Sequence, residues 1–233
     1  MSAQAAPTPA EIIAKAREKV GGETQLASVK TIILQGDAYD KDGKKVAFTE
    51  TKLKAPNMRR EYVLSTQPGE NGFELISASN GLEGFAKIVR GRTHQTKPFG
   101  LQDITRNTDR LHAEISFFAA PAGGSVTFDA EVLQQGKTCN ALLYKYKGGT
   151  HIRRFFDKQT GQLVAEESYY EADTPQNKRI LTVFEGEISP AGSPIHFPRK
   201  ITRWINGEAS RIEYSKVIVN EAINDSDFAF PMP

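Results

Sequence analysis

Histidines are the first residues to consider for metal or acid–base chemistry, since neutral imidazole is the commonest metal ligand in proteins. The chain of 233 residues has four of them, which stand far apart at His94, His112, His151 and His196. No two histidines, and no histidine with the single cysteine, have the short spacing typical of a zinc site. The sequence therefore predicts no metal site and no cofactor.

Two pairs of carboxylates are close enough in sequence to be considered for acid–base catalysis. Glu166 and Glu167 are adjacent in an apparent strand, so they point to opposite faces and cannot share one site. Glu185 and Glu187 share a face, but the stretch FEGEIS is typical of a solvated outer face. A glycosidase-like role would require such a pair inside a cleft.

Motifs for nucleotide binding and acyl transfer are also missing. Residues 136–138 read Gly-Lys-Thr, but Glu131 stands where a phosphate-binding loop needs its first glycine, and no helix follows. The sequence has no Gly-x-Ser-x-Gly nucleophile elbow. These observations argue against an enzyme.

The arginine pair in LKAPNMRREY, residues 53–62, is the remaining charged motif. Arg59 and Arg60 are neighbours in a predicted strand and therefore point to opposite faces. They cannot act together as one clamp for an acidic ligand. We expect one to be solvated, and we place Arg60 at the rim of a cavity, where it could contact a headgroup.

The composition is that of a globular protein with material for a core. Hydrophobic residues make up 39% and charged residues 25%, and 30 Lys+Arg against 28 Asp+Glu give a net charge of +2. This near-balance lacks the concentrated basic patch of a nucleic-acid-binding protein. The single cysteine, Cys139, excludes an intramolecular disulfide and is expected to be buried. No apolar run approaches the ~18 residues of a membrane-spanning helix.

The first residues, MSAQAAPT, indicate an exported protein. Ala3-Gln4-Ala5 is a small-x-small pattern, as found after removal of a signal peptide. Residues 1–8 are therefore predicted to be a disordered leader, and the protein is expected in the bacterial periplasm. A disordered cytosolic leader is the alternative.

A helix is predicted directly after this leader. Thr8 with Glu11 forms a capping box, Pro9 suits the first helical position, and Gly21 and Gly22 supply a left-handed stop. From residue 29 the apolar period changes to two, and Asp42-Gly43 is the first of several hairpin signals. The sequence predicts a mainly β protein with about 11 antiparallel strands, a number at which an open sheet curls. Residues 9–233 show no linker and are expected to form a single domain.

One amphipathic helix interrupts the strands between residues 100 and 118. Its apolar residues recur at alternating spacings of three and four, which places them on one face. Leu101, Ile104, Leu111 and Ile115 are expected to form the underside of a lid over the sheet.

Aromatic residues, with 13 Phe, 7 Tyr and 1 Trp, occur in nearly every predicted strand. They could simply fill a core, yet a strongly curled sheet can enclose a ligand cavity. Alternation along the strands gives the residues expected to line it: Met58, Tyr62, Leu142, Tyr144 and Ile201. Alternation alone does not say which face is inside.

Three stretches together resemble the LolA/LolB-like superfamily of outer-membrane lipoprotein-sorting proteins. They are EIIAKAREKVGGETQLASVKTIILQG at the start, LKAPNMRREY, and the closing HFPRKITRWING with RIEYSKVIVNEAINDSDFAFP. The resemblance implies an unclosed, strongly curved barrel covered by an N-terminal helix and a lid helix. It also implies binding of lipid or lipoprotein acyl chains by a periplasmic monomer, with envelope proteins and transient membrane contact as further partners and no nucleic acid.

The chain departs from the lipoprotein carriers at one position. In those proteins an arginine directly before the proline of LKAPNMRREY contacts the lid, and here that position is Ala55. The resemblance therefore transfers no latch to this residue.

Three functions stay open on sequence grounds. A carrier of acyl chains requires an apolar cavity under the helix of residues 100–118. A structural or sensor module of the cell envelope on the same fold requires a collapsed core and an exposed apolar patch. An enzyme on this scaffold requires carboxylates or histidines that converge in the cavity.

Overall fold

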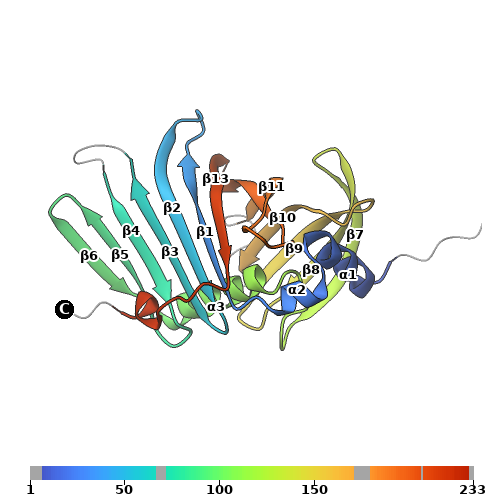
Figure 1. Cartoon of the computed structure of the whole chain (residues 1–233), viewed down its shortest axis with the longest axis horizontal. Helices are drawn as coiled ribbons and strands as arrows, with labels where there is room; N and C mark the ends of the chain where they lie inside the picture. Colours follow the sequence, from blue (N-terminus) through green and yellow to red (C-terminus); the bar gives the residue numbers. More distant parts are fainter. Residues whose placement is uncertain (1–6, 67–71, 171–178, 206, 231–233) are drawn as a thin grey trace, which may run out of the picture.

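The computed structural model describes residues 7–66, 72–170, 179–205 and 207–230 (Figure 1). Most of the predicted leader, residues 1–6, lies outside the described residues. The described chain forms one antiparallel sheet with α-helices on its concave side.

Thirteen strands make up this sheet within the described residues. They are β1 (Thr31–Tyr39), β2 (Lys45–Lys54), β3 (Met58–Ser65), β4 (Glu74–Ser79), β5 (Gly84–Arg90), β6 (Thr93–Pro98), β7 (Ser125–Gln134), β8 (Lys137–Lys145), β9 (Thr150–Asp157), β10 (Leu163–Tyr170), β11 (Ile180–Ile188), β12 (Phe197–Ile205) and β13 (Glu208–Val219).

The sheet is a meander whose first and last strands meet in the middle. The order is β6-β5-β4-β3-β2-β1-β13-β12-β11-β10-β9-β8-β7, and β1 pairs with β13 through registers such as Ile32 with Val219. The edges β6 and β7 stay apart, so the sheet curls without closing. The predicted mainly β fold with an unclosed barrel is confirmed.

The strand count exceeds the expected eleven or so because β6 was not predicted. Its sequence THQTKP has no apolar residue at alternate positions, and all six residues are exposed. It pairs with β5 at the sheet edge, where backbone hydrogen bonds form without a buried face.

Helix α1 begins and ends where the sequence signals predict, and α3 lies within the predicted residues 100–118, whereas the short helix near the C-terminus was not predicted. They are α1 (Pro9–Val20), α2 (Glu23–Ala27), α3 (Leu101–Ile115) and the 3₁₀ helix η2 (Asp225–Phe228). At the start of α1, the Thr8 hydroxyl accepts from the Glu11 amide at 3.3 Å and Glu11 Oε2 accepts from the Thr8 amide at 2.7 Å, completing the capping box. Gly21 follows with φ +141°, which a residue with a Cβ rarely adopts. Among the described helices, none combines the length and hydropathy needed to cross a membrane.

Helix α3 joins the two sheet edges, because it connects β6 to β7. It lies against β3 and β4 on one side and β9 on the other, and Figure 1 shows it passing below the strands. Past its end, Phe117 and Phe118 have left-handed φ angles of 47° and 71°. Arg17 of α1 holds this bend, since its Nη1 donates to the carbonyls of Ser116 and Phe117 at 2.7 and 2.8 Å.

The concave side carries two apolar clusters. In one, Leu111 of α3 and Phe117 pack with Ile32 and Leu53 of the sheet. In the other, α1 packs on β8 and β9: Ile12, Ala16, Leu142, Tyr144, Ile152 and Phe156 are its main members. The convex side has a smaller cluster in which Phe228 of η2 covers Ile33 and Met58. Figure 1 shows the C-terminal segment crossing this side of the sheet.

Candidate functional site

A cavity of about 690 Å³ lies between α3 and the concave face of the sheet. This volume is within the range of roughly 300 to 1,000 Å³ typical of small-molecule sites. Strands β9 to β13 and β1 form most of its wall, and the ends of α1 and α3 complete it. Apolar side chains dominate the lining, among them Ile32, Leu34, Phe117, Phe184 and Ile201.

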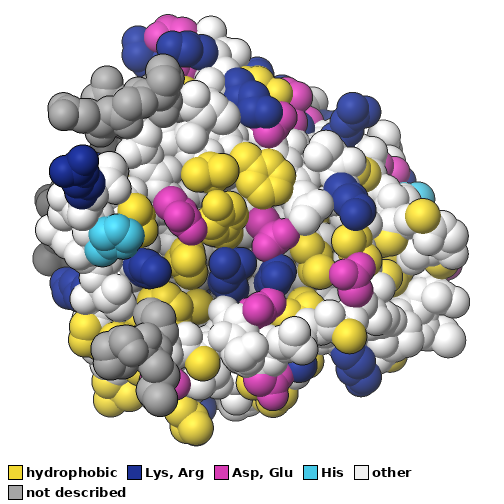
Figure 2. All heavy atoms as spheres, turned by 60° about the vertical axis from the view of Figure 1, so that its left-hand side comes forward, with side chains coloured by type: hydrophobic (Ala, Val, Ile, Leu, Met, Phe, Trp, Pro, Cys, Tyr) yellow, Lys and Arg dark blue, Asp and Glu magenta, His cyan; other side chains and the backbone are white. Residues whose placement is uncertain are grey.

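Charged side chains also line this cavity. Lys19, Arg106, Arg110, Arg154 and Arg203 are basic, and Glu114, Glu166 and Glu187 are acidic. Figure 2 shows a hollowed face on which hydrophobic side chains gather beside basic and acidic ones. The site therefore combines an apolar wall with several buried or half-buried charges.

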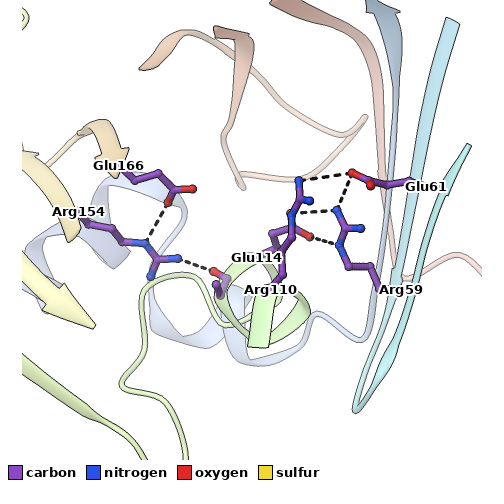
Figure 3. Close-up of polar contacts among 7 residues, drawn as sticks. Arg59, Glu61, Arg110, Glu114, Arg154 and Glu166 are labelled. Atoms are coloured by element: carbon purple, nitrogen blue, oxygen red, sulfur yellow. Dashed lines mark hydrogen bonds and ion pairs between the residues drawn. The ribbon is translucent and has the colours of Figure 1, made fainter. Parts of the chain in front are cut away.

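One group of charges joins α3 to β3. Arg59 of β3 donates from Nε to Glu114 Oε2 at 3.0 Å and from Nη2 to Glu61 Oε1 at 2.8 Å. Arg110 of α3 contacts the same two carboxylates, Glu61 at 3.4 Å and Glu114 at 3.2 Å. Figure 3 shows Arg59 and Glu61 reaching α3 from the sheet.

The arginines determine the protonation of the two carboxylates. Burial alone would raise the pKa of Glu61, but the charges of Arg59 and Arg110 hold it well below its ordinary value. The pKa of Glu114 is also lowered, since burial is again outweighed by Arg59 and Arg110. The pKa of Arg59 is raised, because both carboxylates outweigh its own desolvation. The group is therefore ionised at neutral pH.

A second arginine reaches α3 from the other side of the cavity. Arg154 of β9 is buried, its Nη2 donates to the Ala113 carbonyl at 2.8 Å, and its Nε donates to Glu166 at 3.4 Å (Figure 3). Its guanidinium also lies over the Tyr144 ring at 4.6 Å. Burial raises the pKa of Tyr144 to about 12, so this phenol is neutral beside the cation.

Two further contacts fix α3 along its length. Asp109 accepts from the amides of Gly148 at 3.2 Å and Thr150 at 3.1 Å, which ties α3 to the turn between β8 and β9. A Cβ at Gly148 would lie 2.3 Å from Thr105 Cγ2, so this close approach requires glycine. On the opposite side, His112 Nε2 lies 3.2 Å from the Pro56 carbonyl oxygen. Helix α3 is thus anchored to both halves of the sheet.

Comparisons with known proteins identify the fold. No protein-family model and no curated protein match the sequence. A DUF1329 family protein from Desulfovibrio piger has a TM-score of 0.58 at 12% identity, covering 94% of this chain and 95% of that one. A domain named for outer-membrane lipoprotein sorting from Vibrio parahaemolyticus has a TM-score of 0.58 at 10% identity, covering 94% of each chain. A LolA superfamily protein from Nitrosomonas europaea has a TM-score of 0.55 at 15% identity, covering 97% of this chain and 99% of that one.

The chain has a LolA-like fold. The resemblance drawn from the sequence motifs is therefore confirmed at the level of fold. At these sequence identities the comparisons show the fold alone, so the ligand has to be inferred from the residues of the site.

Within this LolA-like fold, part of the sequence-predicted set lies on the concave side. Ile201 lines the cavity. Leu111 is buried, and Ile115 is partly buried against the same apolar cluster. Leu142 and Tyr144 face the same side, but α1 covers them and they belong to the core under that helix.

Other predicted positions need correction. Met58 and Arg60 lie on the convex side: Met58 packs by Phe228, and Arg60 pairs with Glu50 at 3.4 Å. Tyr62 shares their face and lies under the Arg60 guanidinium at 5.4 Å. The expected inner face of β3 was therefore inverted, because alternation groups these residues without telling which group faces inward.

The N-terminal turn of α3 also differs from the expected lid underside. Leu101 is 80% exposed, and Ile104 is half-buried outside the cavity lining. The apolar contact of α3 with the sheet is concentrated further along, at Leu111. Whether any of the predicted residues contacts a ligand stays a prediction.

Sequence reasoning missed the charged residues that join α3 to the sheet. Ala55 has no charged side chain that could hold α3, but His112 of α3 contacts the turn that contains Ala55. Four residues later, Arg59 makes the buried ion pair with Glu114 of α3. The available signal was an arginine on one face of β3 together with Arg110 and Glu114 one helical turn apart. Among the described residues, no group of three or more His, Cys, Asp and Glu is placed to hold a metal ion.

Proposed function

We propose that this protein binds the acyl chains of lipids or lipoproteins without enzymatic chemistry and carries them across the bacterial periplasm. The observation that carries the proposal is the apolar-lined cavity of about 690 Å³ beneath α3. Each methylene that moves from water into such a cavity contributes about 0.8 kcal/mol, so a long chain can be held without a covalent bond. Phe184 of β11 and Ile201 of β12 are cross-strand neighbours on the concave face of the sheet, and they supply part of this surface.

The cavity favours a carrier over a purely structural or sensor module. A module of that kind has no need of internal space, and its core would be expected to close by side-chain packing. Here the core under α1 is closely packed at Leu142 and Tyr144, whereas the space beside it stays open. The difference within one concave face supports a binding role for the open part.

Helix α3 is the element that would control access in this proposal. It covers the cavity and is held by ion pairs from Arg59 on one side and by Arg154 on the other. Release of a chain would require α3 to move, which would break at least one of these contacts. Arg59 replaces, in this role, the arginine that the resemblance places at Ala55.

The cellular setting follows from the same proposal. The small-x-small pattern in residues 3–5 and the solved domain named for lipoprotein sorting support an exported protein in the periplasm. The continuous sheet supports residues 9–233 as a single domain. We propose a monomer that exchanges its cargo with envelope proteins or, transiently, with the membrane.

A displacement assay with neutral ligands tests the binding role. The apolar dye N-phenyl-1-naphthylamine should fluoresce in the cavity, and 1-hexadecanol should displace it. Ile201→Trp adds bulk inside the cavity and should weaken both ligands at least tenfold, whereas Leu133→Trp makes a similar change at an exposed position of β7 and should have no effect. If the wild-type protein takes up neither ligand, or if Ile201→Trp binds as well as the wild type, the proposal is wrong.

A further inference from the structure

Among the described residues, positive charge exceeds negative charge in one group of side chains from β3, α3 and β12. Three arginines, Arg59, Arg110 and Arg203, act here on two carboxylates, Glu61 and Glu114. Arg59 is only 2% exposed and has contacts to both carboxylates. Among the described residues, the group therefore leaves one guanidinium charge without a carboxylate counterpart.

The arginines repel one another. The pKa of Arg110 is lowered mainly by the charge of Arg59, and burial and the charge of Arg203 lower it further. The charge of Glu61 acts in the opposite direction. Among the described residues, Arg203 makes no ion pair with a carboxylate, although its charge contributes to the low pKa of Glu61. An additional anion would relieve this repulsion.

The uncompensated charge lies in the wall of the cavity. Arg110 and Arg203 both line it, and Ile201 lines it two residues before Arg203 on the same face of β12. Across the ladder, Thr182 of β11 stands opposite Arg203 and Phe184 stands opposite Ile201. The apolar wall therefore continues directly into the guanidinium group.

A neutral hydroxyl stands beside these arginines. Tyr214 of β13 lines the same cavity, and burial raises the pKa of its phenol despite the opposing charge of Arg203. A neutral phenol can donate a hydrogen bond to an anion. Two guanidinium groups and one phenol thus supply donors at one place in the wall.

We propose that the cavity selects anionic amphiphiles, with the alkyl chain along Ile201 and Phe184 and a carboxylate or phosphate head against Arg203, Arg110 and Tyr214. The inference rests on the proposed acyl-chain binding and adds the chemical class of the head. Arginine suits it because the planar guanidinium donates two parallel hydrogen bonds to a carboxylate or a phosphate. A neutral head would leave the surplus charge uncompensated.

Matched pairs of ligands with the same chain test this selectivity. Displacement of N-phenyl-1-naphthylamine is measured with hexadecanoate against 1-hexadecanol, and with palmitoyl lysophosphatidic acid against monopalmitoylglycerol. At least one anionic member should bind roughly tenfold or more tightly than its neutral partner, which is the ratio typical of one charge-assisted contact. Which anionic member gains identifies the head as carboxylate or phosphate.

Three substitutions at two positions of β12 show which residue causes the selectivity. Arg203→Met should bring the anionic-to-neutral ratio close to one, and Arg203→Lys should keep part of the preference. Lys200→Met removes one positive charge from the opposite face of β12, where Lys200 pairs with Glu185 at 2.7 Å, and should leave the ratio intact.

The outcomes separate the two proposals. Equal binding of anionic and neutral ligands by the wild type, or an equal loss of preference in Arg203→Met and Lys200→Met, would overturn the charge selectivity while acyl-chain binding stands. Failure of the wild type to bind any of the four ligands would overturn both.

Discussion

The adjacent arginines of β3 allow a sharp test of how α3 is held. Arg59 faces inward, is 2% exposed and contacts Glu114 and Glu61 at 3.0 and 2.8 Å. Arg60 faces outward, is 17% exposed and forms an ion pair with Glu50 at 3.4 Å. Substitution of each by methionine removes the same charge and a similar volume on opposite sides of one strand.

The two substitutions should differ in free energy of unfolding. Removal of one partner from a buried ion pair typically costs about 3–5 kcal/mol. Arg110 remains near Glu61 and Glu114 after the loss of Arg59, so Arg59→Met is expected at the lower end, about 3 kcal/mol. Arg60→Met removes a partly solvated pair and should cost at most about 1 kcal/mol.

Urea denaturation with linear extrapolation measures both values. In the double variant Arg59→Met/Glu114→Gln, the loss should be smaller than the sum of the single losses, because the second substitution removes a carboxylate that the first leaves less well compensated. Equal destabilisation by Arg59→Met and Arg60→Met, or strictly additive effects of Arg59→Met and Glu114→Gln, would refute the reasoning that Arg59 anchors α3.

Two further predictions concern the same helix. The pKa values of Glu61 and Glu114 lie below their ordinary value of 4.5, so the ionised carboxylates stabilise the folded protein above pH 4.5, and this contribution is lost as the pH falls through the lowered folded-state values. The urea midpoint of the wild type should therefore decline in that acid range, and the midpoint of Glu114→Gln should decline less. Parallel declines of the two midpoints would contradict the prediction. Leu111→Ala should cost about 2–5 kcal/mol because Leu111 is fully buried, while Leu101→Ala should change unfolding by less than about 0.5 kcal/mol because Leu101 is largely exposed, and thermal denaturation that ranks them otherwise would show that α3 packs differently.

Local signals in the sequence predicted the elements well. The capping box at Thr8 and Glu11 and the apolar face of α3 depend on contacts between residues three or four apart, which the sequence states directly. The alternation in β1 to β5 and β7 to β13 predicted a large, curled antiparallel sheet, and the resemblance to the LolA/LolB-like superfamily implied that this sheet is unclosed. Strand β6 was not predicted because its residues are polar and exposed and show no apolar alternation. It is part of the sheet through backbone pairing with β5.

The site was less accessible to prediction because it depends on which face of each strand turns inward. Met58 and Tyr62 alternate correctly with Arg59 and Glu61, but only the contact of Arg59 with Glu114 shows that the arginine is the inner residue. Tyr144 lies on the inner face as expected, yet α1 fills the space in front of it. These outcomes are set by packing between distant segments, which no local pattern encodes.

Direct location of a bound chain tests the central claim, that the cavity beneath α3 holds acyl chains. Crystals grown with a fatty alcohol carrying bromine at the end of its chain would place the alkyl group by anomalous scattering. The account predicts a bromine peak inside the cavity, within contact of side chains such as Phe184 and Ile201. A bromine peak outside this cavity, or a ligand-saturated crystal with the cavity free of chain density, would contradict it.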